Sequence, residues 1–200
     1  RVAGLAFLAN FVLQLLGDFV TIIARGGESF VQRARHATEH ELLWRVSLLE
    51  VGLAWIATGI LAFALYVVLE PVNKRLAQLA LCLRLGGSFV GASSLAFRVA
   101  VAWLYKASAT EGLFTTEQQR TLVSVLTRGA SEGVEVAWIL QGAGSTLFFL
   151  LFLRSRYLPR ALATVGMLGA AVLVSMSAVM FVFPQYIGVL KMVGVPGFLA

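Results

Sequence analysis

The sequence has few charged residues: only 13% of its 200 residues are Asp, Glu, Lys or Arg. A soluble domain carries about 25% charged residues, so this composition excludes a typical water-soluble protein. Hydrophobic residues make up 59% of the chain, and several runs reach the roughly 20 apolar residues that a helix needs to cross a bilayer. These runs do not alternate apolar and polar residues, as the strands of a membrane barrel do. The sequence therefore predicts an all-α, integral membrane helical bundle.

Features that several other classes of protein require are also missing. The single cysteine, Cys82, excludes a disulfide framework. The net charge is +6, but the basic residues are scattered, so we expect them to meet anionic lipid head groups rather than nucleic acid. The sequence contains no glycine-rich phosphate loop, nucleophile elbow or kinase signature. These absences favour a non-enzymatic protein, although one short motif described below leaves an enzyme open.

Apolar runs separated by polar turns divide the chain into segments of a single transmembrane domain, residues 1–200. Pro71 ends one run because proline interrupts a helix, and Gly87 with Gly91 forms a pair of small residues suited to close helix contact. We predict five complete spanning helices and a sixth that is partial or truncated, at approximately 2–24, 42–69, 76–104, 120–153, 161–183 and 186–200. The missing initial methionine and the apolar last residues lead us to expect that the printed chain is part of a longer one.

The loops at one end of the predicted bundle are short and basic. These loops contain Lys74, Arg75, Arg154, Arg156 and Arg160, and the first residue of the chain, Arg1, lies at the same end. The loops at the other end are longer, and their basic residues are offset by acidic ones. Because Lys and Arg mark cytoplasmic loops, we predict a multi-pass protein with a cytoplasmic N-terminus.

Several charged residues fall inside the predicted spanning helices. At a rise of 1.5 Å per residue, four acids and four bases lie in the outer half of the membrane, and Arg84 lies in the inner half. The eight outer residues are Asp18, Glu50, Glu132, Glu135, Arg45, Arg98, Arg128 and Lys191. A charge that faces lipid costs about 2.5–3.5 kcal/mol or more, so such residues turn inward and pair or line water. The equal numbers of acids and bases predict a buried charge network around an outward-facing polar chamber, with Arg84 at its floor. Ion pairs that only fix helix packing explain the pattern equally well.

Both histidines of the chain lie in one short motif. His36-Ala37-Thr38-Glu39-His40 matches the pattern H-x-x-E-H, in which two histidines on one helix face share a metal and the glutamate acts as a base. The pattern is only five residues long, and no third metal ligand is identifiable. Zinc bound by His36, Glu39 and His40 is therefore a weak prediction, and otherwise we expect no cofactor.

Three stretches carry a resemblance to a known membrane family. They are LYVVLEPVNKRLAQLALCLRL at residues 65–85, RSRYLPRALATVGMLGA at 154–170 and HELLWR at 40–45. They resemble a bacterial and archaeal membrane family that is catalogued as a domain of unknown function, number four-three-eight-six of that series. In that family one helix ends in a Tyr-x-x-Leu-x-Pro-Val-Asn-like turn, the next helix carries an Arg, and a later helix follows a Ser-x-x-Leu-Pro-Arg turn. The matching residues are Tyr66, Leu69, Pro71, Val72, Asn73, Arg84, Ser155, Leu158, Pro159 and Arg160.

The resemblance implies a protein of roughly six helices in a bacterial or archaeal inner membrane. It supplies no activity, and Glu132 and Glu135 do not match the family pattern. Our leading hypothesis is that the polar chamber binds or translocates a small ligand or ion. The first alternative is a structural or accessory subunit with other membrane proteins as partners, and the second is an outward-facing metalloenzyme that uses the H-x-x-E-H motif.

Overall fold

The computed structural model describes residues 8, 10–14, 16, 17, 19, 20, 23, 30–110 and 114–183. Within these ranges every regular element is an α-helix. The helices are α2 (Phe30–Glu39), α3 (Glu41–Leu69), α4 (Lys74–Ser93), α5 (Leu95–Thr110), α6 (Thr116–Ser155) and α7 (Arg160–Val182). The described positions from 8 to 23 are helical as well.

Four helical stretches are long and apolar enough to cross a membrane: Glu41–Leu69, Lys74–Lys106, Thr116–Ser155 and Arg160–Val182. They coincide with the second to fifth helices predicted from the sequence, so the all-α class is confirmed, and the described residues include four candidate membrane spans. The first predicted helix, 2–24, lies partly outside the described residues, and the sixth, 186–200, lies wholly outside them. The predicted count of five complete helices and a partial one is therefore not confirmed.

The predicted helix at 76–104 is two helices, which meet at Ser94. The Ser93 and Ser94 hydroxyls both donate to the Val90 carbonyl oxygen, at 2.8 and 3.0 Å. A serine that bonds back to the preceding turn competes with the backbone ladder and bends a helix. The predicted helix is therefore divided into α4 and α5, although the stretch Lys74–Lys106 still forms one candidate span.

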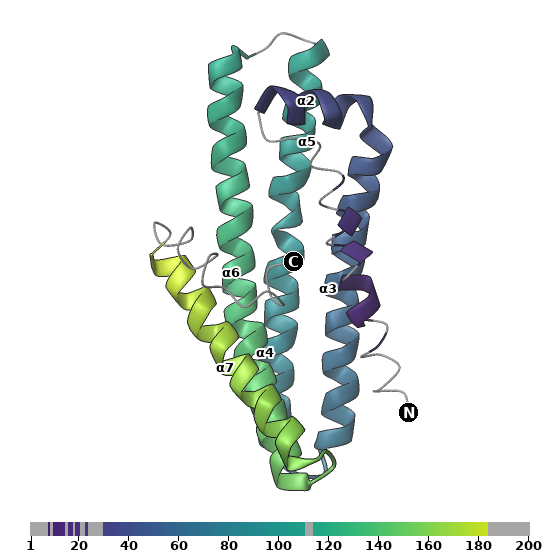
Figure 1. Cartoon of the computed structure of the whole chain (residues 1–200), viewed down its shortest axis with the longest axis vertical. Coiled ribbons are helices and arrows are strands. Elements are labelled where there is room, and N and C mark those ends of the chain that lie inside the picture. Colours follow the sequence, from purple (N-terminus) through teal and green to yellow (C-terminus); the bar gives the residue numbers. More distant parts are fainter. Residues whose placement is uncertain are drawn as a thin grey trace.

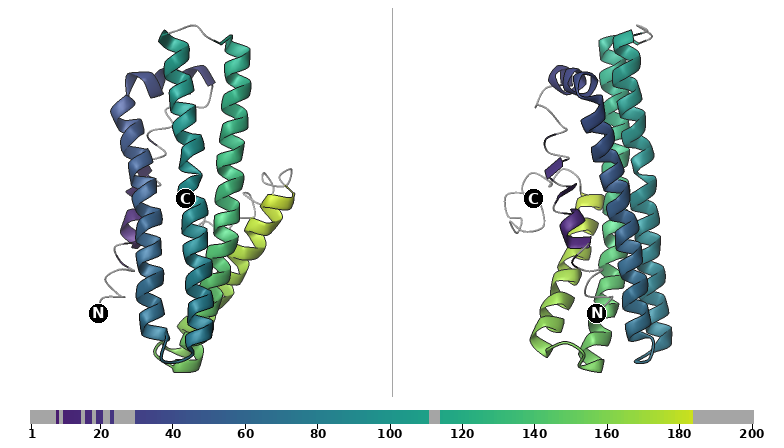
Figure 2. Two further views of the ribbon diagram at one scale, coloured as in Figure 1. Left: turned by 180° about the vertical axis from the view of Figure 1, so that it is seen from behind. Right: turned by 90° about the vertical axis from the view of Figure 1, so that its right-hand side faces the viewer.

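Helices α3, α6 and the stacked pair of α4 and α5 stand side by side as an upright bundle (Figures 1 and 2). Helix α7 leans away from α6 as it rises, and α2 lies across the upper end of the bundle (Figure 1). The turns between α3 and α4 and between α6 and α7 meet at the lower end. Helix α6 has 40 residues and a length of about 60 Å, so it extends well past a hydrocarbon core of about 30 Å.

Local sequence signals set the helix ends. The Asn73 side chain accepts a hydrogen bond from the Leu76 backbone N–H at 3.1 Å and starts α4. Thr115 and Gln118 form a reciprocal capping box at the start of α6. Arg156 ends α6 in the left-handed conformation, with φ 58°. The starts and stops of these helices leave the two basic turns, between α3 and α4 and between α6 and α7, at the lower end of the bundle.

Glycines allow α4 and α6 to approach closely in the lower half of the bundle. A Cβ atom on Gly87 would lie 2.8 Å from the Ala137 carbonyl oxygen, and one on Gly144 would lie 2.8 Å from the Ala80 carbonyl oxygen. Below this contact, the fully buried side chains of Phe148 and Leu151 form a core with residues of α3 and α4. The lower half is therefore the tightly packed part of the bundle.

The described residues before α2 lie against α3. The Thr58 hydroxyl donates to Asn10 Oδ1 at 3.1 Å, and Gly17 lies against the Glu50 carboxyl group. Since the later residue contacts the higher part of α3, this helical stretch runs antiparallel to α3.

Candidate functional site

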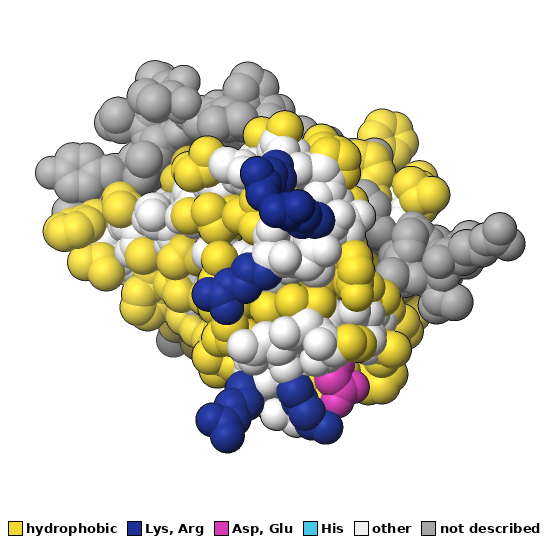
Figure 3. All heavy atoms as spheres, turned by 90° about the horizontal axis from the view of Figure 1, so that it is seen from below, with side chains coloured by type: hydrophobic (Ala, Val, Ile, Leu, Met, Phe, Trp, Pro, Cys, Tyr) yellow, Lys and Arg dark blue, Asp and Glu magenta, His cyan; other side chains and the backbone are white. Residues whose placement is uncertain are grey.

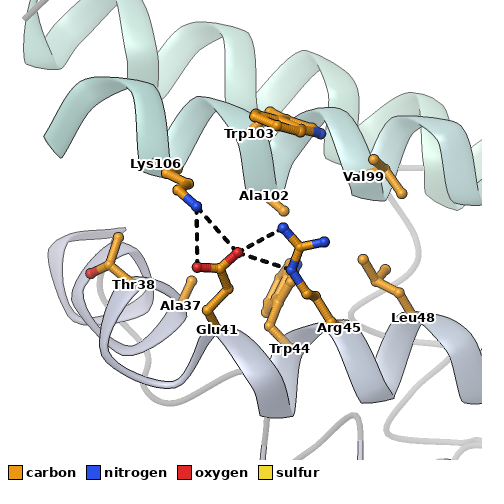
Figure 4. Close-up of a pocket in the computed structure, with 10 residues that line it drawn as sticks. All are labelled: Ala37, Thr38, Glu41, Trp44, Arg45, Leu48, Val99, Ala102, Trp103 and Lys106. Atoms are coloured by element: carbon orange, nitrogen blue, oxygen red, sulfur yellow. Dashed lines mark hydrogen bonds and ion pairs between the residues drawn. The ribbon is translucent and has the colours of Figure 1, made fainter. Parts of the chain in front are cut away.

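A groove of about 420 Å³ opens at the upper end, between α2, α3 and α5 (Figure 4). Helix α2 supplies Ala37 and Thr38, while α3 and α5 supply the two long walls. The wall of α3 contains Glu41, Trp44, Arg45 and Leu48; the wall of α5 contains Val99, Ala102, Trp103 and Lys106. We call this feature the upper groove.

One carboxylate joins the two walls of the upper groove. Glu41 accepts hydrogen bonds from Arg45 Nε at 2.9 Å and Arg45 Nη2 at 2.7 Å, because the two residues lie one turn apart on α3. Lys106 Nζ reaches the same carboxylate from α5, at 3.2 and 3.3 Å (Figure 4). The side chains of Glu41, Arg45 and Lys106 are 44%, 62% and 50% exposed, so water competes for these ion pairs. Two cations and one anion give this group a net charge of +1.

The upper groove changes from polar to apolar with depth. Figure 4 shows Thr38, Glu41 and Lys106 at one end and Leu48 and Val99 at the other. Leu48 lies seven residues below Glu41 on α3, and Val99 lies seven residues below Lys106 on α5. Seven residues of helix span about 10 Å. Both walls therefore pass from charged to apolar over the same depth.

Aromatic residues surround the upper groove. The Trp44 ring packs edge-on against Tyr105, with ring centroids 6.4 Å apart, and Trp103 is 62% exposed on the opposite wall. Tryptophan and tyrosine are typical of the boundary between lipid and water. This position fits a groove at the upper membrane surface.

A second group of polar residues lies between α4 and α6, in the middle of the bundle. Arg84 Nη1 donates to the Ser145 hydroxyl at 2.5 Å. Gln141 Nε2 donates to the Arg84 carbonyl oxygen at 3.0 Å and to the Ser88 hydroxyl at 2.9 Å. We call these four residues the polar seam. Gln141 is only 2% exposed, so these bonds form away from bulk water.

An aromatic pair lies one turn above the polar seam. Trp55 of α3 and Trp138 of α6 have ring centroids 5.7 Å apart, and the Trp55 ring lies against Gly91 of α4. Along their helices, Trp138 and Gly91 each lie three residues above Gln141 and Ser88. The pair separates the polar seam from the upper half of the bundle.

The predicted network of buried charges is not supported. No charged side chain among the described residues is fully buried; Arg84, Glu50, Arg98 and Glu135 are partly exposed. The charges also occur at different places. Arg45 lies in the upper groove, Arg84 in the polar seam, and Glu50 against Gly17.

Two of the predicted chamber residues lie on an exposed face of α6. Arg128 and Glu132 pair with each other at 3.9 Å and are 74% and 51% exposed. Counting residues gives the depth of a side chain along the helix but not its direction around it. Asp18 and Lys191 lie outside the described residues.

The H-x-x-E-H motif lies on α2 and its end. The rings of His36 and His40 have centroids 4.6 Å apart, with their planes tilted by 51°. Glu39, however, accepts a hydrogen bond from Arg35 Nε at 2.6 Å. This bond holds the pKa of Glu39 below its ordinary value, so the carboxylate is ionised and bound to Arg35 at neutral pH. No group of three or more residues able to hold a metal occurs among those the structure describes.

Several residues that form these sites were not predicted from the sequence, among them Glu41, Gln141 and Lys106. Glu41 was detectable, because an acid four residues before Arg45 is a common helical pair. Gln141 was detectable as a polar residue in the apolar part of α6. Lys106 was not, because it reaches Glu41 across 65 positions of the chain.

The fold and its four candidate spans define a multi-spanning α-helical membrane protein. The family model described as Domain of unknown function (DUF4386) matches residues 2–200, so the chain belongs to that family and the resemblance described above is confirmed. No curated protein and no solved structure matches the chain.

Proposed function

We propose that this protein binds an anionic membrane lipid in the upper groove. The observation that carries the proposal is the change from charge to apolar surface along both walls, from Glu41 to Leu48 and from Lys106 to Val99. A lipid has the same order of parts, with a charged head group followed by acyl chains. The net charge of +1 on the groove residues favours an anionic head group, since each basic residue near such a surface contributes about 1 kcal/mol.

The charge distribution supports an outward-facing upper groove. Basic side chains are spread over the lower end of the bundle, where few acidic ones are visible (Figure 3). The turns at this end contain Lys74, Arg75, Arg154, Arg156 and Arg160, and Glu70 is their acidic residue. The positive-inside rule assigns such an end to the cytoplasm. The N-terminal stretch, which runs upward beside α3, then starts on the cytoplasmic side.

Lipid binding narrows the broader hypothesis of a small ligand or ion. The groove supplies one anchoring region with an apolar floor, which fits an amphiphile better than a hydrated ion. Among the described residues, no observation specifically favours an accessory subunit or a metalloenzyme.

Quenching of tryptophan fluorescence tests the proposal, because Trp44 and Trp103 line the groove. The probes are phosphatidylglycerol and phosphatidylcholine, each brominated on its acyl chains and added to purified protein in neutral detergent. We expect stronger quenching by the anionic lipid. A variant with Arg45→Gln and Lys106→Gln should lose that difference, with an affinity for brominated phosphatidylglycerol at least tenfold lower.

The matched control removes the same charge from the opposite end of the bundle. Lys74→Gln with Arg75→Gln should keep the preference for the anionic lipid, because neither residue lines the groove. Equal quenching of the unmodified protein by both lipids would show the proposal to be wrong, as would an equal loss in both double variants.

A further inference from the structure

Arg84 lies at the centre of a membrane-spanning helix pair. It is ten residues above Lys74, the first residue of α4, and its partner Ser145 is ten residues above Ser155, the last residue of α6. Both distances correspond to a rise of about 15 Å. The guanidinium group therefore lies inside the membrane-spanning part of the bundle, about 15 Å above the lower ends of α4 and α6.

The partners of Arg84 are neutral. Nη1 donates to the Ser145 hydroxyl, which itself donates to the Gln141 carbonyl oxygen at 2.7 Å. None of the ion pairs among the described residues includes Arg84. Arginine stays protonated in proteins, and an intramembrane charge requires a partner of opposite sign or a water-filled space. The described residues supply neither an acid nor a bonded carbonyl for this cation.

One edge of the guanidinium is left without an acceptor. Arg84 Nε is buried and has no hydrogen-bond partner among the described residues. The Nε and Nη2 hydrogens point the same way and form the fork that binds two oxygens of a carboxylate or phosphate. Nη1, which is bonded to Ser145, belongs to the other side of the group. The arrangement therefore holds the cation by one side and leaves the oxoanion-binding side available.

The backbone around Arg84 is fixed. Gln141 binds the Arg84 carbonyl oxygen, and a Cβ atom on Gly144 would lie 2.6 Å from Arg84 Cγ. Gln141 Oε1 is also buried without a donor among the described residues. Buried polar atoms are normally hydrogen-bonded. This acceptor needs a donor, which the P–OH group of a hydrogen phosphate supplies and an ionised carboxylate does not.

We propose that Arg84 binds an oxoanion, a carboxylate or a phosphate group, between the membrane-spanning helices α4 and α6. The anion pairs with the Nε edge of Arg84 and neutralises the charge. This site is separate from the upper groove, because the Trp55–Trp138 pair lies between them. It does not depend on lipid binding at the groove.

Thermal unfolding of purified protein in neutral detergent tests the site with two probes. Sodium phosphate represents a free ion, and decanoate, kept below its micelle concentration, represents a membrane amphiphile; sodium chloride at equal ionic strength is the reference. We expect at least one probe to raise Tm in a saturable way, because a ligand that binds the folded state stabilises it. The probe that acts distinguishes the two sources of the oxoanion.

Arg84→Lys tests the guanidinium edge and keeps the positive charge. It should weaken the response to the effective probe at least tenfold, because an ammonium group lacks the two-pronged geometry. Arg75→Gln, in the turn at the lower end of the bundle, lies in neither site and should respond like the unmodified protein. Absence of a saturable rise with both probes, or an unchanged response in Arg84→Lys, would overturn the proposal.

A second pair of variants tests an internal counter-ion. If Arg84→Gln lowers Tm and the added change Asp18→Asn restores it, the two residues pair with each other and the oxoanion proposal is wrong. If Asp18→Asn leaves the effect of Arg84→Gln unchanged, the proposal stands. Neither outcome bears on the brominated-lipid experiment, so the two proposals fail separately.

Discussion

The upper groove and the polar seam both contain cations inside or beside the membrane, but they hold them differently. In the upper groove Arg45 and Lys106 share the Glu41 carboxylate, and all three side chains are about half exposed or more. In the polar seam Arg84 is held by neutral hydroxyl and amide groups between closely packed helices. Exposed ion pairs contribute little to stability, whereas hydrogen bonds in a tight helix contact fix its geometry. The comparison indicates that the seam fixes how α4 packs on α6, whereas the ion pairs of the groove contribute little to stability.

The largest effect should follow from forcing α4 and α6 apart. Gly144→Val would place side-chain atoms against the Ala80 carbonyl oxygen and Arg84 Cγ, which lie 2.8 and 2.6 Å from an added Cβ. Because backbone cannot move aside as a flexible side chain can, we expect a loss of about 3 kcal/mol or more in the free energy of unfolding. Thermal unfolding and size-exclusion chromatography in detergent measure this change.

Gly169→Val is the matched control, because a Cβ on Gly169 of α7 meets nothing within 4 Å. It should retain a sharp elution peak and a Tm close to that of the unmodified protein. Similar losses in both variants would mean that valine is harmful in any of these helices, and the special role of the seam contact would be disproved.

The second effect concerns the hydrogen bonds of the seam. Gln141→Leu removes the donors to the Arg84 carbonyl oxygen and the Ser88 hydroxyl, but it also removes the orphaned Oε1 atom. Hydrogen bonds between membrane helices average about 0.6 kcal/mol each, so we expect a net destabilisation of about 1 kcal/mol. Reversible unfolding in mixed micelles measures it. An increase in stability would show that the amide is kept for binding rather than for packing.

The third prediction addresses the groove and should leave stability almost unchanged. Glu41→Gln raises the net charge of the three groove residues from +1 to +2. We expect the affinity for brominated phosphatidylglycerol to rise about fivefold, since one added unit of charge near the surface is worth about 1 kcal/mol. Quenching of tryptophan fluorescence measures the affinity. A fall in affinity would mean that Glu41 orients the cations more than it neutralises them.

The difference between the two regions also explains what the sequence could predict. The helices of α3, α6 and α7 were predicted close to their ends because apolar length, Pro71 and the basic turns are local signals. The sequence also predicts that Arg84 and Ser88 share a face, since these residues lie four apart on one helix. Their partner Gln141 lies more than 50 positions away, and only the packing of α4 on α6 joins them.

The predicted network of buried charges is not supported, for a physical reason that particular residues illustrate. Depth along a helix follows from counting residues, but the direction of a side chain depends on which neighbours cover the helix. Arg128 and Glu132 have the depth that the prediction required, yet they face outward and pair with each other. The break at Ser94 was missed because a serine in an apolar run gives no sign of whether its hydroxyl bonds the preceding turn or another helix.

The smallest effect concerns α2, which closes the groove from above. The hydrogen bond from Arg35 lowers the pKa of Glu39 from its ordinary value of 4.5. A carboxyl group with a lowered pKa stabilises the folded state above its unfolded pKa, and the contribution is lost as pH falls through the folded pKa. We therefore expect hydrogen exchange in α2 to be constant from pH 7 to 6, after correction for the intrinsic rate, and to quicken slightly below pH 4.5.

Glu39→Gln should remove this dependence, because it leaves no proton to bind at that position. A pH dependence that persists in Glu39→Gln would assign the effect to another carboxyl group, and α2 would then be held by its apolar contacts with α5 rather than by this ion pair.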